Sequence, residues 1–225
     1  MKKLFFVWLL FCAGLLAGCA LDRRITQPTQ LPQERCDLPI WDVGDYWRYQ
    51  TEEGKWFAWK VVDVTDRLYV LESAANKDYR FAFDRRTLGF KEYIGSEGRK
   101  VVPFRDSGLF FDFPLFVGKK WDRMITGETD RHFDWNYLMS YRVISLEEVK
   151  VPAGTFKAFR IEQQMKDATI GGEVISYYWF SPEVKNILRF KFVRSYGSWI
   201  IKSQDYELTS YKIGKPDDQK IRRKD

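Results

Sequence analysis

Residues 149–192 read VKVPAGTFKAFRIEQQMKDATIGGEVISYYWFSPEVKNILRFKF, and this stretch decides the fold. Pro152, Ala153 and Gly154 have the composition of a turn. After the turn, two sets of side chains alternate: Phe156, Ala158, Arg160 and Glu162 with Lys157, Phe159, Ile161 and Gln163. A period of two is typical of a strand with two different faces. Because the turn is short, the strands on either side of it are predicted to pair antiparallel.

Short strands separated by turn residues fill most of the remaining chain, and no stretch has a sustained helical period. The pattern predicts a mainly β protein with little helix, built on an antiparallel sheet, sandwich or barrel. A long strand over 137–151 is expected to bend near Ser145. The other predicted strands lie at 46–50, 55–64, 68–73, 79–83, 90–94, 100–104, 173–180, 187–196 and 199–211.

Similar sequence segments recur in the same order in the two halves of the chain. Val43-Gly44-Asp45-Tyr46-Trp47 is similar to Val117-Gly118-Lys119-Lys120-Trp121. The aromatic segments 79–84 and 88–91 are likewise similar to 178–181 and 188–191, in the same order. This internal similarity predicts two related β-meanders that lie side by side in one curved sheet. Chance similarity between aromatic strands is the alternative interpretation.

The first residues have the organisation of a secretory signal. Lys2 and Lys3 precede the apolar run 4–16, which is too short to span a bilayer of about 30 Å. Leu16-Ala17-Gly18-Cys19 then resembles the lipobox of bacterial lipoproteins. The resemblance implies a signal peptide over 1–18, diacylglyceryl on the Cys19 thiol and a further acyl chain such as palmitate on the new amine, which together anchor a protein without a transmembrane helix. Ordinary secretory cleavage near the same point is the alternative.

The rest of the chain divides into three parts. Residues 19–40, with Pro28 and Pro32, are predicted to be a lipidated N-terminus and extended tether. Residues 41–213 form the predicted β-rich periplasmic domain, and 214–225 a charged tail. Because Ala20 rather than Asp follows the cysteine, the sorting rule of the lipoprotein family implies the outer membrane, facing the periplasm.

Charge and cysteine usage limit the classes of partner. Without Lys2 and Lys3, 35 basic and 31 acidic residues leave a net charge of +4, which is too weak and too evenly spread for nucleic acid. Cys12 leaves with the signal peptide and Cys19 carries lipid, so the mature chain has no internal disulfide. Cys36 then stands alone in the predicted tether, either as an intermolecular disulfide partner or as an inert thiol.

Three motifs carry a further resemblance, which covers residues 43–211: VGDYWRY at 43–49, VPAGTFKAFRI at 151–161 and YYWFSPEV at 177–184. They resemble a group of uncharacterised periplasmic β-rich domains similar in pattern to the LolA/LolB-type lipoprotein-localisation fold. That resemblance implies a curved, open half-barrel whose concave face can hold acyl chains.

Catalytic groups are sparse. His132, the single histidine, lies between Asp130 and Asp134, and a solvated hairpin is the preferred interpretation over a metal site. The adjacent Glu147 and Glu148 point to opposite faces of a strand, which is a poor arrangement for acid–base chemistry. Basic residues beside strands could meet phosphate or glycan, but a solvated face is preferred: Arg85, Arg86, Arg189, Lys191 and Arg194. We predict no enzymatic activity, no metal and no cofactor.

Aromatic residues make up 17% of the chain and suit either a pleated, half-buried surface or a cavity lined with rings. The irregular, apolar segment 106–117 could form the lip of such a cavity. Two functions follow: a non-catalytic interaction or assembly module with an envelope protein as partner, or a binder of an apolar ligand such as an acyl chain. The candidate ligand-binding residues are Phe110, Phe111, Phe113, Phe116, Trp121 and Trp179.

Overall fold

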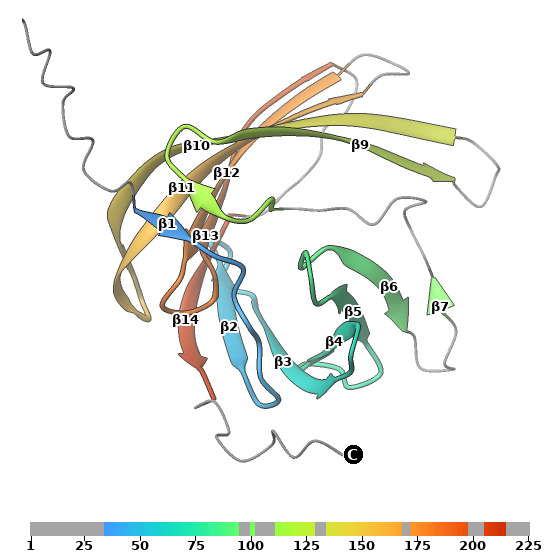
Figure 1. Cartoon of the computed structure of the whole chain (residues 1–225), viewed down its shortest axis with the longest axis vertical. Coiled ribbons are helices and arrows are strands. Elements are labelled where there is room, and N and C mark those ends of the chain that lie inside the picture. Colours follow the sequence, from blue (N-terminus) through green and yellow to red (C-terminus); the bar gives the residue numbers. More distant parts are fainter. Residues whose placement is uncertain are drawn as a thin grey trace, which may run out of the picture. The chain divides into compact units, whose positions relative to one another are not determined.

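The computed structural model describes residues 34–94, 100–101, 111–128, 134–167, 172–197 and 205–214 (Figure 1). The predicted signal peptide, Cys19, Phe110 and His132, and the tail from residue 215, lie outside the described residues. The described residues contain strands and no helix, which confirms the predicted fold class. The strands are β1 (Arg35–Cys36), β2 (Tyr46–Thr51), β3 (Trp56–Val64), β4 (Leu68–Ser73), β5 (Arg80–Asp84), β6 (Phe90–Ile94), β7 (Lys100–Val101), β8 (Leu115–Phe116), β9 (Lys120–Glu128), β10 (Asp134–Val151), β11 (Gly154–Asp167), β12 (Gly172–Ser181), β13 (Asn186–Gly197) and β14 (Tyr206–Lys212).

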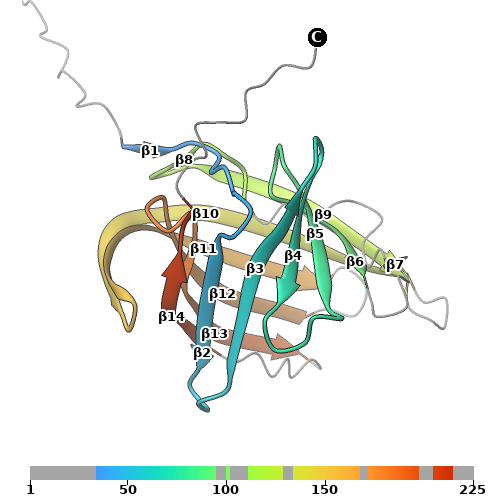
Figure 2. The ribbon, with the colours of Figure 1, turned by 90° about the horizontal axis from the view of Figure 1, so that it is seen from below.

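One large open sheet contains twelve of these described strands, in the order β7-β6-β5-β4-β3-β2-β14-β13-β12-β11-β10-β9. All neighbours pair antiparallel. The order is that of two meanders, β2–β7 and β9–β14, joined where the first strand of one pairs with the last strand of the other. Figure 2 shows strands β2–β6 in front of β10–β13. The prediction of two meanders side by side in one sheet is therefore confirmed.

The two V-G-x-x-W segments form the same local structure at the start of each meander. Gly44 has a φ of 99° and Gly118 a φ of 90°, a region that glycine enters without steric cost. The Gly44 N–H donates to the Val61 carbonyl at 2.8 Å, and the Gly118 N–H donates to the Val143 carbonyl at 2.9 Å. Each glycine thus turns the chain into the first strand of its meander and attaches that turn to the second strand.

The second strand of each meander also carries a bulge directly after this valine. The register shifts between Val61 and Asp63 in β3, and between Val143 and Ser145 in β10. A bulge leaves one residue unpaired and bends the strand. The bend expected near Ser145 is confirmed, and the first meander has its equivalent.

The β10–β11 hairpin has the turn that its sequence predicts. Val151 pairs with Gly154, so Pro152 and Ala153 occupy the turn. Gly154 has a φ of 142°, and a Cβ there would lie 3.1 Å from the Phe156 ring. Glycine is therefore required for both backbone conformation and space.

Each face of β11 is buried at a different place along the strand. Phe156 and Ala158, near the turn, belong to one hydrophobic cluster, together with Trp47. Phe159 and Ile161 point to the opposite face and belong to a second cluster. The alternation in the sequence thus marks two buried faces rather than one buried and one solvated face.

Part of the predicted tether packs on the domain. Arg35 and Cys36 form β1, which pairs with Phe116 and Leu115 of β8. Cys36 is only 5% exposed, and burial, reinforced by Asp37, raises the pKa of its thiol to about 12. Residues 34–40 are therefore not a free linker, because β1 and β8 form a separate two-stranded sheet and Cys36 is buried in a hydrophobic cluster of the domain.

Candidate ligand-binding site

A cavity of about 450 Å³ lies between the two meanders, and aromatic rings form most of its wall. The first meander and the segment before it contribute Trp41, Tyr49, Phe57, Trp59, Leu71, Phe81, Phe83 and Leu88. The second meander and the segment before it contribute Phe111, Tyr178, Phe180, Asn186, Ile187, Phe190 and Tyr206. Cavities of about 300–1,000 Å³ with mostly apolar walls are the usual form of small-molecule sites.

Strand alternation places these rings. Phe57 and Trp59 are two apart on β3, and Phe81 and Phe83 are two apart on β5, so each pair shares a face. The Trp59 and Phe81 rings meet edge to face with centroids 4.7 Å apart. Tyr206 of β14 packs against Phe57 of β3 with ring centroids 5.2 Å apart. Ring-to-ring packing holds the wall in place.

The few polar groups in the wall are uncharged at neutral pH. The Tyr49 hydroxyl donates to the Ile187 carbonyl at 3.0 Å, and the Tyr178 hydroxyl donates to Gln163 Oε1 at 2.8 Å. Burial raises the pKa of Tyr49, Tyr178 and Tyr206 above the ordinary phenol value. The wall also contains the Asn186 amide, which accepts from the Ile187 N–H at 2.8 Å. Such a wall suits a hydrocarbon better than an ion.

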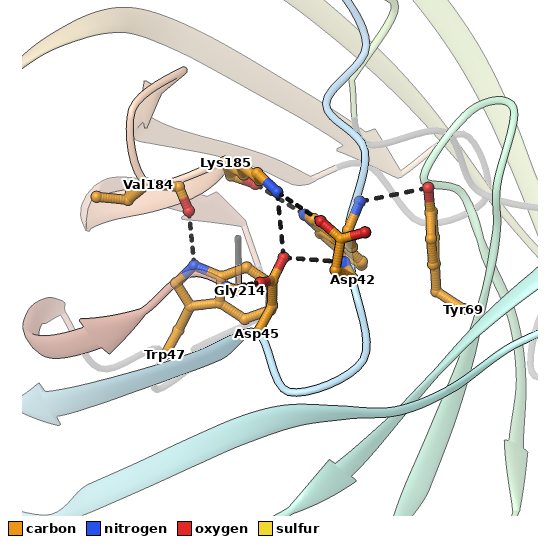
Figure 3. A network of polar contacts seen from close by, with 8 residues as sticks. Asp42, Asp45, Trp47, Tyr69, Val184, Lys185 and Gly214 are labelled. Atoms are coloured by element: carbon orange, nitrogen blue, oxygen red, sulfur yellow. Dashed lines mark hydrogen bonds and ion pairs between the residues drawn. The ribbon is translucent and has the colours of Figure 1, made fainter. Parts of the chain in front are cut away.

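A polar network fastens the β12–β13 turn, which precedes Asn186 and Ile187, to the start of the first meander (Figure 3). Asp45 is fully buried and accepts from the backbone N–H groups of Asp42 at 3.0 Å and Gly214 at 2.6 Å. Lys185 Nζ lies 3.1 Å from an Asp42 carboxylate oxygen and 3.5 Å from an Asp45 oxygen. A buried carboxylate is tolerated because these donors surround it.

Two tryptophans complete this attachment. The Trp41 Nε1–H donates to the Lys185 carbonyl at 2.9 Å, and the Trp47 Nε1–H donates to the Val184 carbonyl at 2.7 Å. Trp41 also lines the cavity. The network therefore fixes one rim of the cavity by joining residues more than 130 positions apart in the sequence.

Of the sequence-predicted site residues, the structure places Phe111 in the cavity wall. Phe113 contacts Phe180 with ring centroids 5.4 Å apart and lines a separate cavity of about 280 Å³. Phe116 is in β8, where the Lys119 ammonium lies 6.0 Å from its ring centroid. Trp121 is buried and stacks on the Tyr141 ring at 4.9 Å. The binding role of these residues stays a prediction.

Trp179 lies on the opposite side of β12 from the cavity residues Tyr178 and Phe180. Its Nε1–H donates to Glu147 at 2.7 Å, and the guanidinium carbons of Arg160 and Arg189 lie 5.4 and 5.5 Å from its ring centroid. Burial would raise the pKa of Glu147, but the hydrogen bonds from Trp179 and Ser145 and the two guanidinium groups lower it overall. Trp179 thus belongs to a network of ion pairs and cation–π contacts.

Sequence reasoning did not find most of the wall: Tyr49, Phe57, Trp59, Phe81, Phe83, Tyr178, Phe190 and Tyr206. The signal that could have identified several of them is the pair of aromatic side chains at i and i+2 in 57–59 and in 81–83.

Two of the basic residues beside strands, for which a solvated face is the preferred interpretation, have partners within the protein. Arg85 donates to the Thr65 carbonyl at 2.8 Å, and Arg189 Nε lies 2.6 Å from Glu207 Oε1. Among the residues that the structure describes, no three His, Cys, Asp or Glu side chains gather as a metal site. The same residues form no helix long and apolar enough to cross a membrane.

No family model and no curated protein matches the chain. Its structure is similar to that of the hypothetical lipoprotein YmcC from Escherichia coli K12, with 11% identity, a TM-score of 0.47 and coverage of 83% of this chain and 86% of that chain. A protein from Parabacteroides distasonis described as a lipoprotein has 14% identity and a TM-score of 0.42 over 80% of this chain and 100% of that chain.

An exported protein with a YmcC-like fold from Bacteroides fragilis has 13% identity and a TM-score of 0.36 over 79% of this chain and 99% of that chain. With identities below 25% and TM-scores below 0.5, these similarities carry neither a function nor a membrane anchor to this chain. The LolA/LolB-type resemblance stays a prediction, as does lipidation at Cys19.

Proposed function

We propose that the domain is a binding module of the bacterial envelope that holds a hydrocarbon chain, such as an acyl chain, in the aromatic cavity between its two meanders. The observation that carries the proposal is the wall itself: eleven of its fifteen side chains are aromatic, and none is charged at neutral pH. The proposed role is binding rather than catalysis, since amide, phenol and indole groups are the only polar side-chain groups in this wall.

The hydrophobic effect supplies enough free energy for such binding. Removing a methylene from water is worth about 0.8 kcal/mol, so a chain of about ten carbons gains roughly 8 kcal/mol on full burial. Lost translational and conformational freedom offsets part of this gain. We therefore expect micromolar rather than nanomolar dissociation constants for single-chain ligands.

Membrane attachment belongs to the same proposal. Acyl chains on Cys19 would tether the domain to the membrane, most simply the outer membrane facing the periplasm, and residues 20–33 would supply the reach. A tethered binding module would meet membrane-derived amphiphiles at high local concentration.

A variant that fills the cavity tests the proposal. Ile187 lines the cavity from β13, and Ile187→Trp would occupy part of its volume. Val193, on the same strand, is 50% exposed and does not line the cavity, so Val193→Trp is the matched control. A fluorescent fatty acid should bind the wild-type chain and the control equally and the Ile187→Trp variant at least tenfold more weakly. Equal binding by all three, or none by the wild type, would remove the proposal.

An assembly module is the second candidate function. Met124 of β9 and Leu138 of β10 are cross-strand partners and are 50% and 37% exposed. They lie beside the β9 edge of the sheet, and an unpaired edge with apolar neighbours is a common docking surface for another protein. In-cell crosslinking from position 124 that captures no envelope protein above background would count against this candidate.

A further inference from the structure

The wall of the aromatic cavity contains a hydroxyl group without a hydrogen-bond partner, that of Tyr206. Among the residues that the structure describes, none forms a hydrogen bond with this hydroxyl. The other two tyrosines of the wall differ, because Tyr49 donates to the Ile187 carbonyl and Tyr178 donates to Gln163. Since a phenol in an apolar environment usually has a partner, the Tyr206 hydroxyl marks a point where a ligand can form a hydrogen bond.

The ring of Tyr206 is held by other rings of the same wall. It meets Tyr49 and Phe57 of the first meander edge to face, with centroids 5.3 and 5.2 Å apart. It stacks on Phe190 of the second meander, with centroids 5.2 Å apart and an angle of 23° between the planes. These contacts fix the ring without using its hydroxyl, so the donor is already oriented before a ligand binds.

The hydroxyl groups of the three wall tyrosines lie near one another. Burial raises the pKa of Tyr49 and of Tyr178, and a negative charge on Tyr206 would raise both pKa values further. Such an effect requires the Tyr206 oxygen to lie within electrostatic range of the other two phenol oxygens. The cavity therefore has one polar region within its aromatic wall, and Tyr206 supplies the donor there that the protein itself does not use.

The remaining polar groups of the wall are also uncharged donors. The Trp59 indole N–H and the Asn186 amide N–H groups have no acceptor among the described residues, whereas the Trp41 N–H is bound to the Lys185 carbonyl. No Lys, Arg, Asp or Glu side chain lines this cavity. A carboxylate or an ammonium group would therefore lose its hydration there without gaining an opposite charge. An uncharged oxygen that accepts hydrogen bonds suits these donors best.

We infer that the aromatic cavity selects an acyl chain in the form of an uncharged ester, and that Tyr206 donates its hydroxyl hydrogen to the ester carbonyl. The inference rests on the proposed binding of a hydrocarbon chain in this cavity. The rings hold the chain, and the Tyr206 hydroxyl distinguishes an ester from an ionised fatty acid. Tyr206 is thus a residue that determines specificity rather than one that supplies most of the affinity.

Infrared spectroscopy of bound methyl decanoate tests the inference, because a hydrogen bond lowers the stretching frequency of an ester carbonyl. The difference between samples with ¹²C and ¹³C at the carbonyl isolates this band from those of the protein. The wild-type chain should show the lowered frequency, and Tyr206→Phe should lose it. Tryptophan fluorescence, to which Trp41 and Trp59 contribute from the wall, measures the affinity. Tyr206→Phe should bind the ester about fivefold more weakly, as expected for one hydrogen bond. The wild type should bind decanoate at pH 8 about tenfold more weakly than the ester.

A matched control removes a hydroxyl outside the cavity. The Tyr177 hydroxyl donates to Glu162 at 2.9 Å, and Tyr177 does not line the cavity, so Tyr177→Phe should keep both the lowered frequency and the affinity. An ester that binds without a lowered carbonyl frequency would overturn the inference while the proposed function stands. So would a lowered frequency that persists in Tyr206→Phe or disappears in Tyr177→Phe, or equal affinity for ester and decanoate. Failure of the wild type to bind either ligand would overturn both.

Discussion

Replacing Asp45 by alanine tests the view that a buried polar network holds the two meanders together. Asp45 accepts two backbone N–H groups, from Asp42 and Gly214, and its carboxylate lies 3.5 Å from Lys185 Nζ (Figure 3). Hydrogen bonds to a charged acceptor contribute about 1.5–3 kcal/mol each, and the variant also leaves two donors without an acceptor. We therefore expect Asp45→Ala to lower the free energy of unfolding by about 3–5 kcal/mol.

Asp42 supplies the control, because it binds the same ammonium group from a more exposed position. Its side chain is 33% exposed, whereas that of Asp45 is fully buried. Partly solvated ion pairs contribute about 0–1 kcal/mol, so Asp42→Ala should cost much less than Asp45→Ala. Urea unfolding followed by tryptophan fluorescence measures both values. Equal losses in the two variants, or a loss below about 1 kcal/mol for Asp45→Ala, would refute the reasoning.

Three further predictions concern stability and reactivity. Burial raises the pKa of the Cys36 thiol to about 12. The thiol should therefore resist aromatic disulfide reagents at pH 8 in the folded chain and react with them in urea. Rapid labelling of the folded chain would contradict the burial of Cys36. Burial raises the pKa of Tyr49 and Tyr206, so their contribution to stability is complete below about pH 10 and falls at higher pH, where the unfolded state loses its protons first. Urea midpoints measured from pH 8 to 11 should decline, and a flat profile would contradict this. Gly44→Ala and Gly118→Ala should each lower the free energy of unfolding by about 1–2 kcal/mol, measured by thermal unfolding. An added Cβ meets nothing within 4 Å at either position, so the penalty comes from the backbone conformation. Clearly unequal losses would contradict the structural equivalence of the two glycines.

The hairpin at 149–161 and the repeated V-G-x-x-W segments could be predicted because both are local. Gly154 lies at a hairpin turn, and Gly44 and Gly118 have positive φ, a conformation that favours glycine. These positions can therefore be recognised from residue type and spacing alone. The order of the strands could be predicted from these turns and repeated segments, since consecutive antiparallel strands usually lie side by side.

The cavity wall was harder to predict, because both faces of several strands are buried. In the run 177–180 every residue is aromatic, so alternation does not reveal which side chains face the cavity. Tyr178 and Phe180 face it, whereas Trp179 joins Arg160 and Glu147 on the other side. Which side chains face the cavity depends on the residues that they contact in other strands. A register shift between Trp179 and Phe180 makes the facing still harder to predict from sequence alternation.

The packing of Cys36 was also beyond local reasoning. Its strand partner, Leu115, is far away in the sequence, and residues 34–40 have the proline and polar content of a linker. Such a segment is ordered by tertiary contact rather than by its own propensity.

The central claim is that a hydrocarbon chain lies between the two meanders, and isotope-filtered NMR tests it most directly. A ¹³C-labelled dodecyl chain is mixed with unlabelled protein, and nuclear Overhauser effects from its methylenes to aromatic protons are recorded. We predict contacts to rings from both meanders, such as Phe57 and Phe81 on one side and Phe180 and Phe190 on the other. Contacts confined to exposed side chains such as Met124 and Leu138, or no contacts at all, would contradict the claim.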